Sequence, residues 1–132
     1  MNQDISDSIL IAIIDDDDFV RMALDSLLRS IGYKVRTYCR ALDFLYSKDM
    51  ADTQCLITDV QMPAVTGVEL HEHLIAMNFT IPTLFITAYP EAIAHLEANI
   101  FPVIGCLSKP CDVDKLLNCI EIATAHRPGG AR

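Results

Sequence analysis

Acidic residues at two points of the sequence could hold a cation and attack phosphorus. Four consecutive aspartates, Asp15 to Asp18, follow one short apolar run, and Asp59 follows another. Carboxylates that a fold brings together repel one another unless a cation compensates them. Oxygen ligands from two or three acids suit Mg²⁺, which also binds phosphoryl oxygens. A carboxylate beside such a metal can act as a nucleophile, so an aspartyl phosphate at Asp59 is the sharpest hypothesis.

A hydroxyl and an amine occupy comparable positions further along the chain. Thr87 ends a fourth apolar run, and Lys109-Pro110 follows a fifth. Both groups could stabilise the negative charge on the oxygens of a transferred phosphoryl group. Taken singly, each residue has an ordinary explanation, since acids often cap helices and a lysine in a loop is commonly a solvated charge. Their shared place at the ends of apolar runs is what favours a site.

The elements that must position these residues follow from hydrophobic periodicity. Short runs rich in Ile, Val and Leu alternate five times with segments of helical spacing, which predicts a parallel sheet covered by helices on both faces. The expected strands are residues 9–14, 34–38, 55–58, 83–87 and 103–107. The expected helices are residues 20–31, stopped by Gly32, then 41–46, 68–77, 92–99 and 113–125, headed by Asp112. The run 34–38 is more polar and is expected at an edge. In such open sheets ligands bind beyond the carboxyl ends of the strands.

The length, charge and cysteine content of the chain exclude several classes of protein. The chain has 132 residues and a net charge of −8, which predicts one globular domain that repels rather than recruits nucleic acid. Its 5 cysteines form no CxxC pair and are expected to be reduced. The acidic N-terminus does not look like a secretory signal and no apolar run is long enough to span a membrane, so a cytoplasmic protein is expected.

Four segments resemble the receiver domain of two-component response regulators. They are IIDDD at 13–17, TDVQMPAVTG at 58–67, FITA at 85–88 and LSKP at 107–110, in the family's order and spacing. The resemblance covers roughly residues 9–125 and implies the flavodoxin-like strand order 2-1-3-4-5. We expect the receiver domain at residues 1–126 and, because Pro128-Gly129-Gly130 breaks the last helix, a tail or the start of a linker at 127–132.

The same resemblance implies a role for each motif residue. A sensor histidine kinase would pass a phosphoryl group to this domain with Mg²⁺ as cofactor. By this resemblance, Asp59 is the phosphoacceptor, and the metal is bound by Asp15, Asp16, Asp59 and the backbone carbonyl of Gln61. Thr87 is the switch hydroxyl, and Lys109 pairs with the phosphate. Such a protein is a signalling phosphoacceptor rather than an enzyme, with slow self-phosphorylation from small phosphodonors and slow self-dephosphorylation.

The resemblance also implies an output. It is nearest to receivers followed by a helix-turn-helix domain, which favours control of transcription, and the face formed by residues 92–99, 103–107 and 113–125 would switch and could form a homodimer. Two sites depart from the family pattern. Phe101-Pro102 stands where many relatives have Ala-Gly. Cys106 stands three residues before the lysine, where an aromatic ring is usual. A thiol cannot sweep the volume of a ring, so we expect a weaker or differently routed switch.

Two other functions compete with this one. The first is a haloacid-dehalogenase-type phosphatase, whose DxDx(T/V) signature fits the segment Asp16-Asp17-Asp18-Phe19-Val20. In such an enzyme Asp16 would attack phosphorus and Asp18 would be the general acid. That assignment leaves the segment around Asp59 unexplained. The third possibility is a degenerate receiver that takes no phosphate and acts only as a protein-docking module, for which Cys106 is the main support.

Overall fold

A five-stranded parallel sheet forms the centre of the molecule. The computed structural model describes residues 9–89 and 103–125. Its strands are β1 (Leu10–Ile14), β2 (Lys34–Tyr38), β3 (Cys55–Asp59), β4 (Thr83–Thr87) and β5 (Val103–Ser108). They pair in the order β2-β1-β3-β4-β5, and every pair is parallel. This confirms the expected fold class and strand order.

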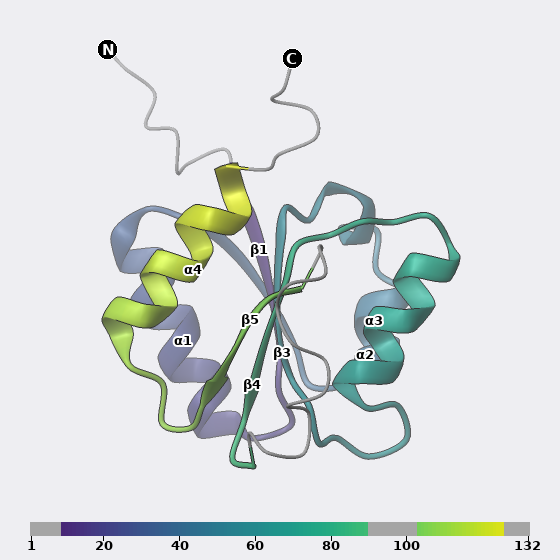
Figure 1. The fold of residues 1–132 in the computed structure, drawn as a ribbon, viewed down its shortest axis with the longest axis horizontal. Helices are drawn as coiled ribbons and strands as arrows, with labels where there is room; N and C mark the ends of the chain where they lie inside the picture. Colours follow the sequence, from purple (N-terminus) through teal and green to yellow (C-terminus); the bar gives the residue numbers. More distant parts are fainter. Residues whose placement is uncertain (1–8, 90–102, 126–132) are drawn as a thin grey trace.

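Helices cover both faces of the sheet. Figure 1 shows α1 and α4 on one side and α2 and α3 on the other. Their bounds are α1 (Asp18–Ile31), α2 (Ala41–Leu45), α3 (Gly67–Ala76) and α4 (Val113–Ala125). A single 3-10 turn, Met50–Asp52, precedes β3 and was not expected from the sequence. The helix expected at residues 92–99 lies outside the described residues.

The central strand β1 shows why its sequence is apolar throughout. Ile11 and Ile13 belong to the core beneath α1 and α4, whereas Ala12 and Ile14 belong to the core beneath α2 and α3. All four side chains are fully buried, since successive side chains of a strand point to opposite faces. In β2, by contrast, only Val35 is fully buried, which confirms the edge position expected for that strand.

The start and end of α1 are set by specific residues. The Asp17 carboxylate accepts hydrogen bonds from the backbone N–H groups of Phe19 and Val20, which satisfies two donors that the first helical turn leaves free. Gly32 ends the helix in the left-handed region, at φ 116°, where a glycine meets no steric penalty. Because α1 starts three residues after Asp15, it holds the acidic segment directly against the end of β1.

The loop after β3 is closed by a tight contact at Gly67, the first residue of α3. Its backbone N–H donates to the carbonyl of Val60 at 2.9 Å. A Cβ atom added to Gly67 would lie 2.2 Å from the backbone oxygen of Asp59. Glycine is therefore required here for close approach of two backbone segments, and this approach helps to place Asp59.

We predict that Gly67→Ala destabilises the fold by roughly 1–3 kcal/mol, because the new methyl group meets rigid backbone rather than a side chain that could move away. Gly105→Ala in β5 is the matched control. There an added Cβ would lie 3.6 Å from the Cys119 and Leu84 side chains, which is ordinary contact. Chemical denaturation of both variants checks this, and equal stabilities would contradict the proposed packing at Gly67.

Candidate functional site

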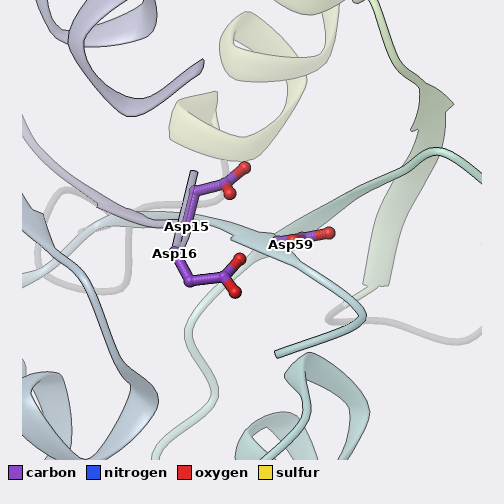
Figure 2. Close-up of side chains that lie close together, drawn as sticks. All are labelled: Asp15, Asp16 and Asp59. Atoms are coloured by element: carbon purple, nitrogen blue, oxygen red, sulfur yellow. The ribbon is translucent and has the colours of Figure 1, made fainter. Parts of the chain in front are cut away.

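Three carboxylates converge where β1 and β3 end. The two strands are neighbours, with Ile14 opposite Thr58, so the residues that follow them meet at one edge of the sheet. Figure 2 shows Asp15, Asp16 and Asp59 lying close together. One carboxylate oxygen of each lies within 4.8 Å of the others. Asp15 and Asp59 are buried while Asp16 is exposed, so the cluster opens to solvent on one side.

Lys109 supplies the positive charge for the two buried carboxylates. Its Nζ lies 3.0 Å from Oδ2 of Asp15 and 3.3 Å from Oδ2 of Asp59. Its backbone N–H donates to the carbonyl of Thr87 at 2.9 Å, which anchors the residue at the end of β4. The lysine side chain therefore reaches from the β5 side of the sheet to both acids.

The electrostatics of Asp59 reflect a site with more acid than base. Burial raises the pKa of this carboxyl group, and the neighbouring charge of Asp15 raises it further. Lys109 and the backbone N–H of Gln61 lower the pKa but do not cancel the rise. For Lys109 the balance is reversed: burial lowers the pKa of the ammonium, and the contacts with Asp15 and Asp59 raise it by more. A divalent cation would relieve the remaining repulsion.

Asp15 is held by contacts to both of its oxygens. Its Oδ1 accepts a hydrogen bond from the N–H of Asp17 at 2.9 Å, and its Oδ2 faces Lys109. Its backbone N–H donates to the carbonyl of Tyr38 at the end of β2. Asp15 is thus a fixed member of the cluster, while the exposed Asp16 carboxylate is the most accessible to an incoming ion.

Thr87 and Gln61 lie beside the cluster. Thr87 is buried and follows Ile86, the residue that pairs with Asp59 in the sheet. Its hydroxyl oxygen accepts a hydrogen bond from the N–H of Tyr89 at 3.0 Å. The Gln61 N–H points at the Asp59 carboxylate. The switching role of Thr87 and the metal contact of the Gln61 carbonyl stay predictions.

None of the five cysteines belongs to the carboxylate cluster. None of them forms a disulfide in the described part of the chain: Cys55 is buried, Cys111 and Cys119 are half-buried, and Cys39 and Cys106 are exposed. Burial raises the pKa of the Cys111 thiol, and the nearby charges of Lys109 and Asp15 also act on it. Burial raises the pKa of the Cys55 thiol to about 12, so this group is a neutral core residue. Cys106 lies opposite Phe85 in the β4–β5 pair. The expectation of reduced thiols therefore fits the structure.

Two contributors to the site escaped the sequence analysis. Gly67 is the last residue of the motif at 58–67 and had no role of its own there, and its close approach to Asp59 is a contact between backbones that no composition signal reveals. Arg21 was not singled out. Its spacing from Asp18 is typical of an ion pair on a helix, which the structure contains, but Arg21 also donates to the carbonyl of Asp15.

Comparison with known proteins decides the family. The profile of the family described as response regulator receiver domain matches residues 11–121. The chain belongs to this family. Among curated relatives, the response regulator protein TmoT of Ectopseudomonas mendocina is 34% identical over 122 residues, which is 90% of this chain and 54% of TmoT. The transcriptional regulatory protein FixJ of Bradyrhizobium diazoefficiens is 33% identical over 122 residues, 92% of this chain and 60% of FixJ.

Solved structures of receivers agree with this assignment. The crystal structure of FixJ-N has a TM-score of 0.76 and 29% identity, and the match covers 95% of this receiver and 97% of that chain. The structure of the response regulator StyR has a TM-score of 0.76 and 32% identity, over 91% of this receiver and 61% of that chain. The receiver spans about half the length of the curated relatives TmoT and TdiR.

Among the described helices, none has the length and apolarity needed to cross a bilayer.

The charge balance of the site predicts the pH dependence of stability. Because the pKa of Asp59 is raised in the folded receiver, folding favours its protonated form, and its ionisation lowers stability as pH rises through the folded-state pKa. We therefore expect Asp59→Asn to raise the midpoint of thermal unfolding at pH 7 without Mg²⁺, with the difference shrinking as pH falls from the raised folded-state pKa toward the ordinary pKa of aspartate. Calorimetry between pH 4 and 7 checks this, and a lower midpoint for the variant at neutral pH would contradict it.

Proposed function

We propose that this receiver is a phosphoacceptor that takes a phosphoryl group onto Asp59 from a phosphohistidine of a sensor histidine kinase. The observation that carries the proposal is the cluster of Asp15, Asp16 and Asp59 with Lys109 beside it. A carboxylate oxygen of Asp59 forms the new bond to phosphorus while the bond from phosphorus to the imidazole nitrogen breaks. The imidazole leaves as a base, and solvent returns its proton.

The donor set fits Mg²⁺. Three carboxylates with one oxygen each inside a 4.8 Å cluster offer the hard oxygen ligands that this ion requires, and the exposed side leaves room for its waters. The groups that would hold the ion are the carboxylates of Asp15, Asp16 and Asp59 and the backbone carbonyl of Gln61. When bound, Mg²⁺ offsets the negative charge that gathers on the phosphoryl oxygens.

Lys109 and Thr87 would recognise the phosphorylated state. The Lys109 ammonium already lies within 3.3 Å of Asp59 Oδ2, so a phosphoryl group there gives it a more highly charged partner. The Thr87 hydroxyl accepts from Tyr89 and still has its own proton to donate. Donating that proton to a phosphoryl oxygen would draw the loop after β4 toward Asp59.

The phosphatase alternative loses its support at Asp18. This residue is the first of α1, its side chain is 71% exposed, and it forms an ion pair with Arg21. The metal-ligand cluster contains Asp59 rather than Asp18. A general acid would have to face the attacked phosphorus. The signalling role therefore fits the geometry better, with only slow self-phosphorylation and self-dephosphorylation.

We also propose that the receiver controls transcription through a partner surface. FixJ and TdiR are transcriptional regulatory proteins, and the matched region is 60% and 50% of their lengths. The net charge of −8 argues against direct binding of nucleic acid by residues 1–126, and residues 127–132 would be a tail or the start of a linker. The switching face would combine residues 92–99 with β5 and α4, and could pair two copies.

Labelling tests the phosphoacceptor. With acetyl phosphate and Mg²⁺, the receiver should gain the mass of one phosphoryl group, and Asp59→Asn should abolish the gain because the nucleophile is lost. Asp18→Asn is the matched control and should label normally, since Asp18 lies outside the cluster.

Undiminished labelling of Asp59→Asn would refute the assignment. Labelling that instead disappears in Asp18→Asn and Asp16→Asn would favour the phosphatase alternative. If the parent protein takes no phosphoryl group, the docking-module function gains.

Amide exchange tests the switch. Beryllofluoride with Mg²⁺ mimics a phosphoryl group on Asp59, and we expect it to change protection after Thr87 and around residues 101–102, because Thr87 and Lys109 would follow the new charge. The mass in solution should rise if the switching face pairs two copies. The same addition to Asp59→Asn is the control. Changes confined to Asp15, Asp16, Asp59 and their neighbours, with residues 91–120 indifferent and the mass constant, would contradict switching.

A further inference from the structure

The guanidinium of Arg21 ties the first turn of α1 to the backbone of the acidic pair. Its Nη1 donates to the carbonyl oxygen of Asp15 at 2.6 Å, and its Nη2 forms an ion pair with Asp18. The arginine side chain is only 17% exposed and its bond to the Asp15 carbonyl is partly buried, whereas the Asp18 end of the ion pair is open to water. A hydrogen bond from a charged donor is among the stronger ones in proteins.

The carbonyl that Arg21 holds belongs to the peptide joining Asp15 to Asp16. Asp15 has other anchors, because its side chain contacts Asp17 and Lys109 and its N–H reaches Tyr38. Asp16 differs. It is exposed, and within residues 9–89 and 103–125 no hydrogen bond or ion pair holds its carboxylate. The direction of the Asp16 side chain therefore depends on the orientation of its backbone.

We propose that Arg21 is a positioning residue for the metal site. By fixing the plane of the Asp15–Asp16 peptide, it keeps an Asp16 oxygen within the 4.8 Å cluster that includes Asp59. The inference rests on the proposed function, because it assigns Arg21 to the Mg²⁺ site described above. Groups that orient a metal ligand without touching the metal typically change affinity by about 10–100-fold when removed.

A purely structural role is the competing explanation, and α1 contains a control for it. Arg29, near the other end of the helix, makes the same pair of contacts. Its Nε pairs with Asp25 at 2.6 Å and its Nη2 donates to the carbonyl of Val35 at 2.7 Å. Each arginine thus joins a helix acid to a backbone carbonyl outside the helix. Only the contact of Arg21 lies at the carboxylate cluster.

Charge and position predict opposite effects on metal affinity. Arg21 is a cation close to a cation site, so simple Coulomb repulsion predicts that removing it tightens Mg²⁺ binding. Loss of the bond to the Asp15 carbonyl predicts weaker binding, because Asp16 is then free to turn away. Asp18 already pairs with the guanidinium and reduces its field at the site, so the positional effect should dominate.

The test is calorimetric titration of the intact protein with Mg²⁺ alone. We expect Arg21→Gln to raise the dissociation constant about tenfold. Arg29→Gln, which loses an equivalent pair of bonds, should change it by less than about twofold. Asp18→Asn removes the ion pair but keeps the bond to Asp15, and should also stay within about threefold of the parent. Asp16→Ala, which removes the ligand itself, sets the scale of a complete loss.

A second readout separates position from folding. The rate of labelling by acetyl phosphate in Arg21→Gln should fall at low Mg²⁺ and recover at saturating Mg²⁺, because only the affinity for the metal has changed. Unchanged or tighter Mg²⁺ binding in Arg21→Gln, or a similar loss in Arg29→Gln, would overturn the positioning role while leaving Asp59 as the phosphoacceptor. If the parent binds no Mg²⁺, the proposed function itself fails.

Discussion

Repulsion between two buried carboxylates, offset by one ammonium, is the constraint on which this structure depends. Asp15 and Asp59 lie at the ends of adjacent strands, where little water can screen them. Charges in such surroundings interact more strongly than at the surface. Lys109 lies between them at 3.0 and 3.3 Å, but one positive charge cannot balance two negative ones and a third nearby. The folded receiver therefore retains a deficit of positive charge, which a divalent ion can fill.

The scaffold around this cluster resists the repulsion largely by fixing the backbone, in addition to the contacts that hold the Asp15 carboxylate. The N–H of Asp15 is tied to β2, and Gly67 brings the start of α3 against the backbone of Asp59. Capping of α1 by Asp17 and the bond from Arg21 to the Asp15 carbonyl act on the intervening turn. These contacts come from different parts of the chain. They hold the carboxylates close together, in the arrangement that a bound metal ion would need.

The sequence predicted the general arrangement because it depends on local patterns. Alternating apolar runs and helical spacing predict a parallel sheet, and the ends of its strands place Asp15, Asp59 and Lys109 at one edge. The strand order itself came from the resemblance to receivers. The contacts of Arg21 and Gly67 could not be predicted in this way, because they depend on which backbone oxygen lies opposite a given atom after packing. Hydrophobic periodicity indicates which face of a helix or strand is buried, whereas these contacts depend on atomic positions to within a few tenths of an ångström.

Under the proposed function, transmission from this site to a partner would have to follow a route that accommodates Cys106. Phe85 on β4 is fully buried and lies opposite Cys106, which is exposed on β5. A small thiol at that position leaves no ring to move between buried and exposed arrangements. Thr87, two residues beyond Phe85, still joins the site to the loop through its bond with the Tyr89 N–H. A phosphoryl group would shift the populations only by its differential interaction with the two arrangements. Under the proposed function, that difference would come from Thr87, Lys109 and the backbone that they would draw inward, rather than from rotation of an aromatic side chain on β5.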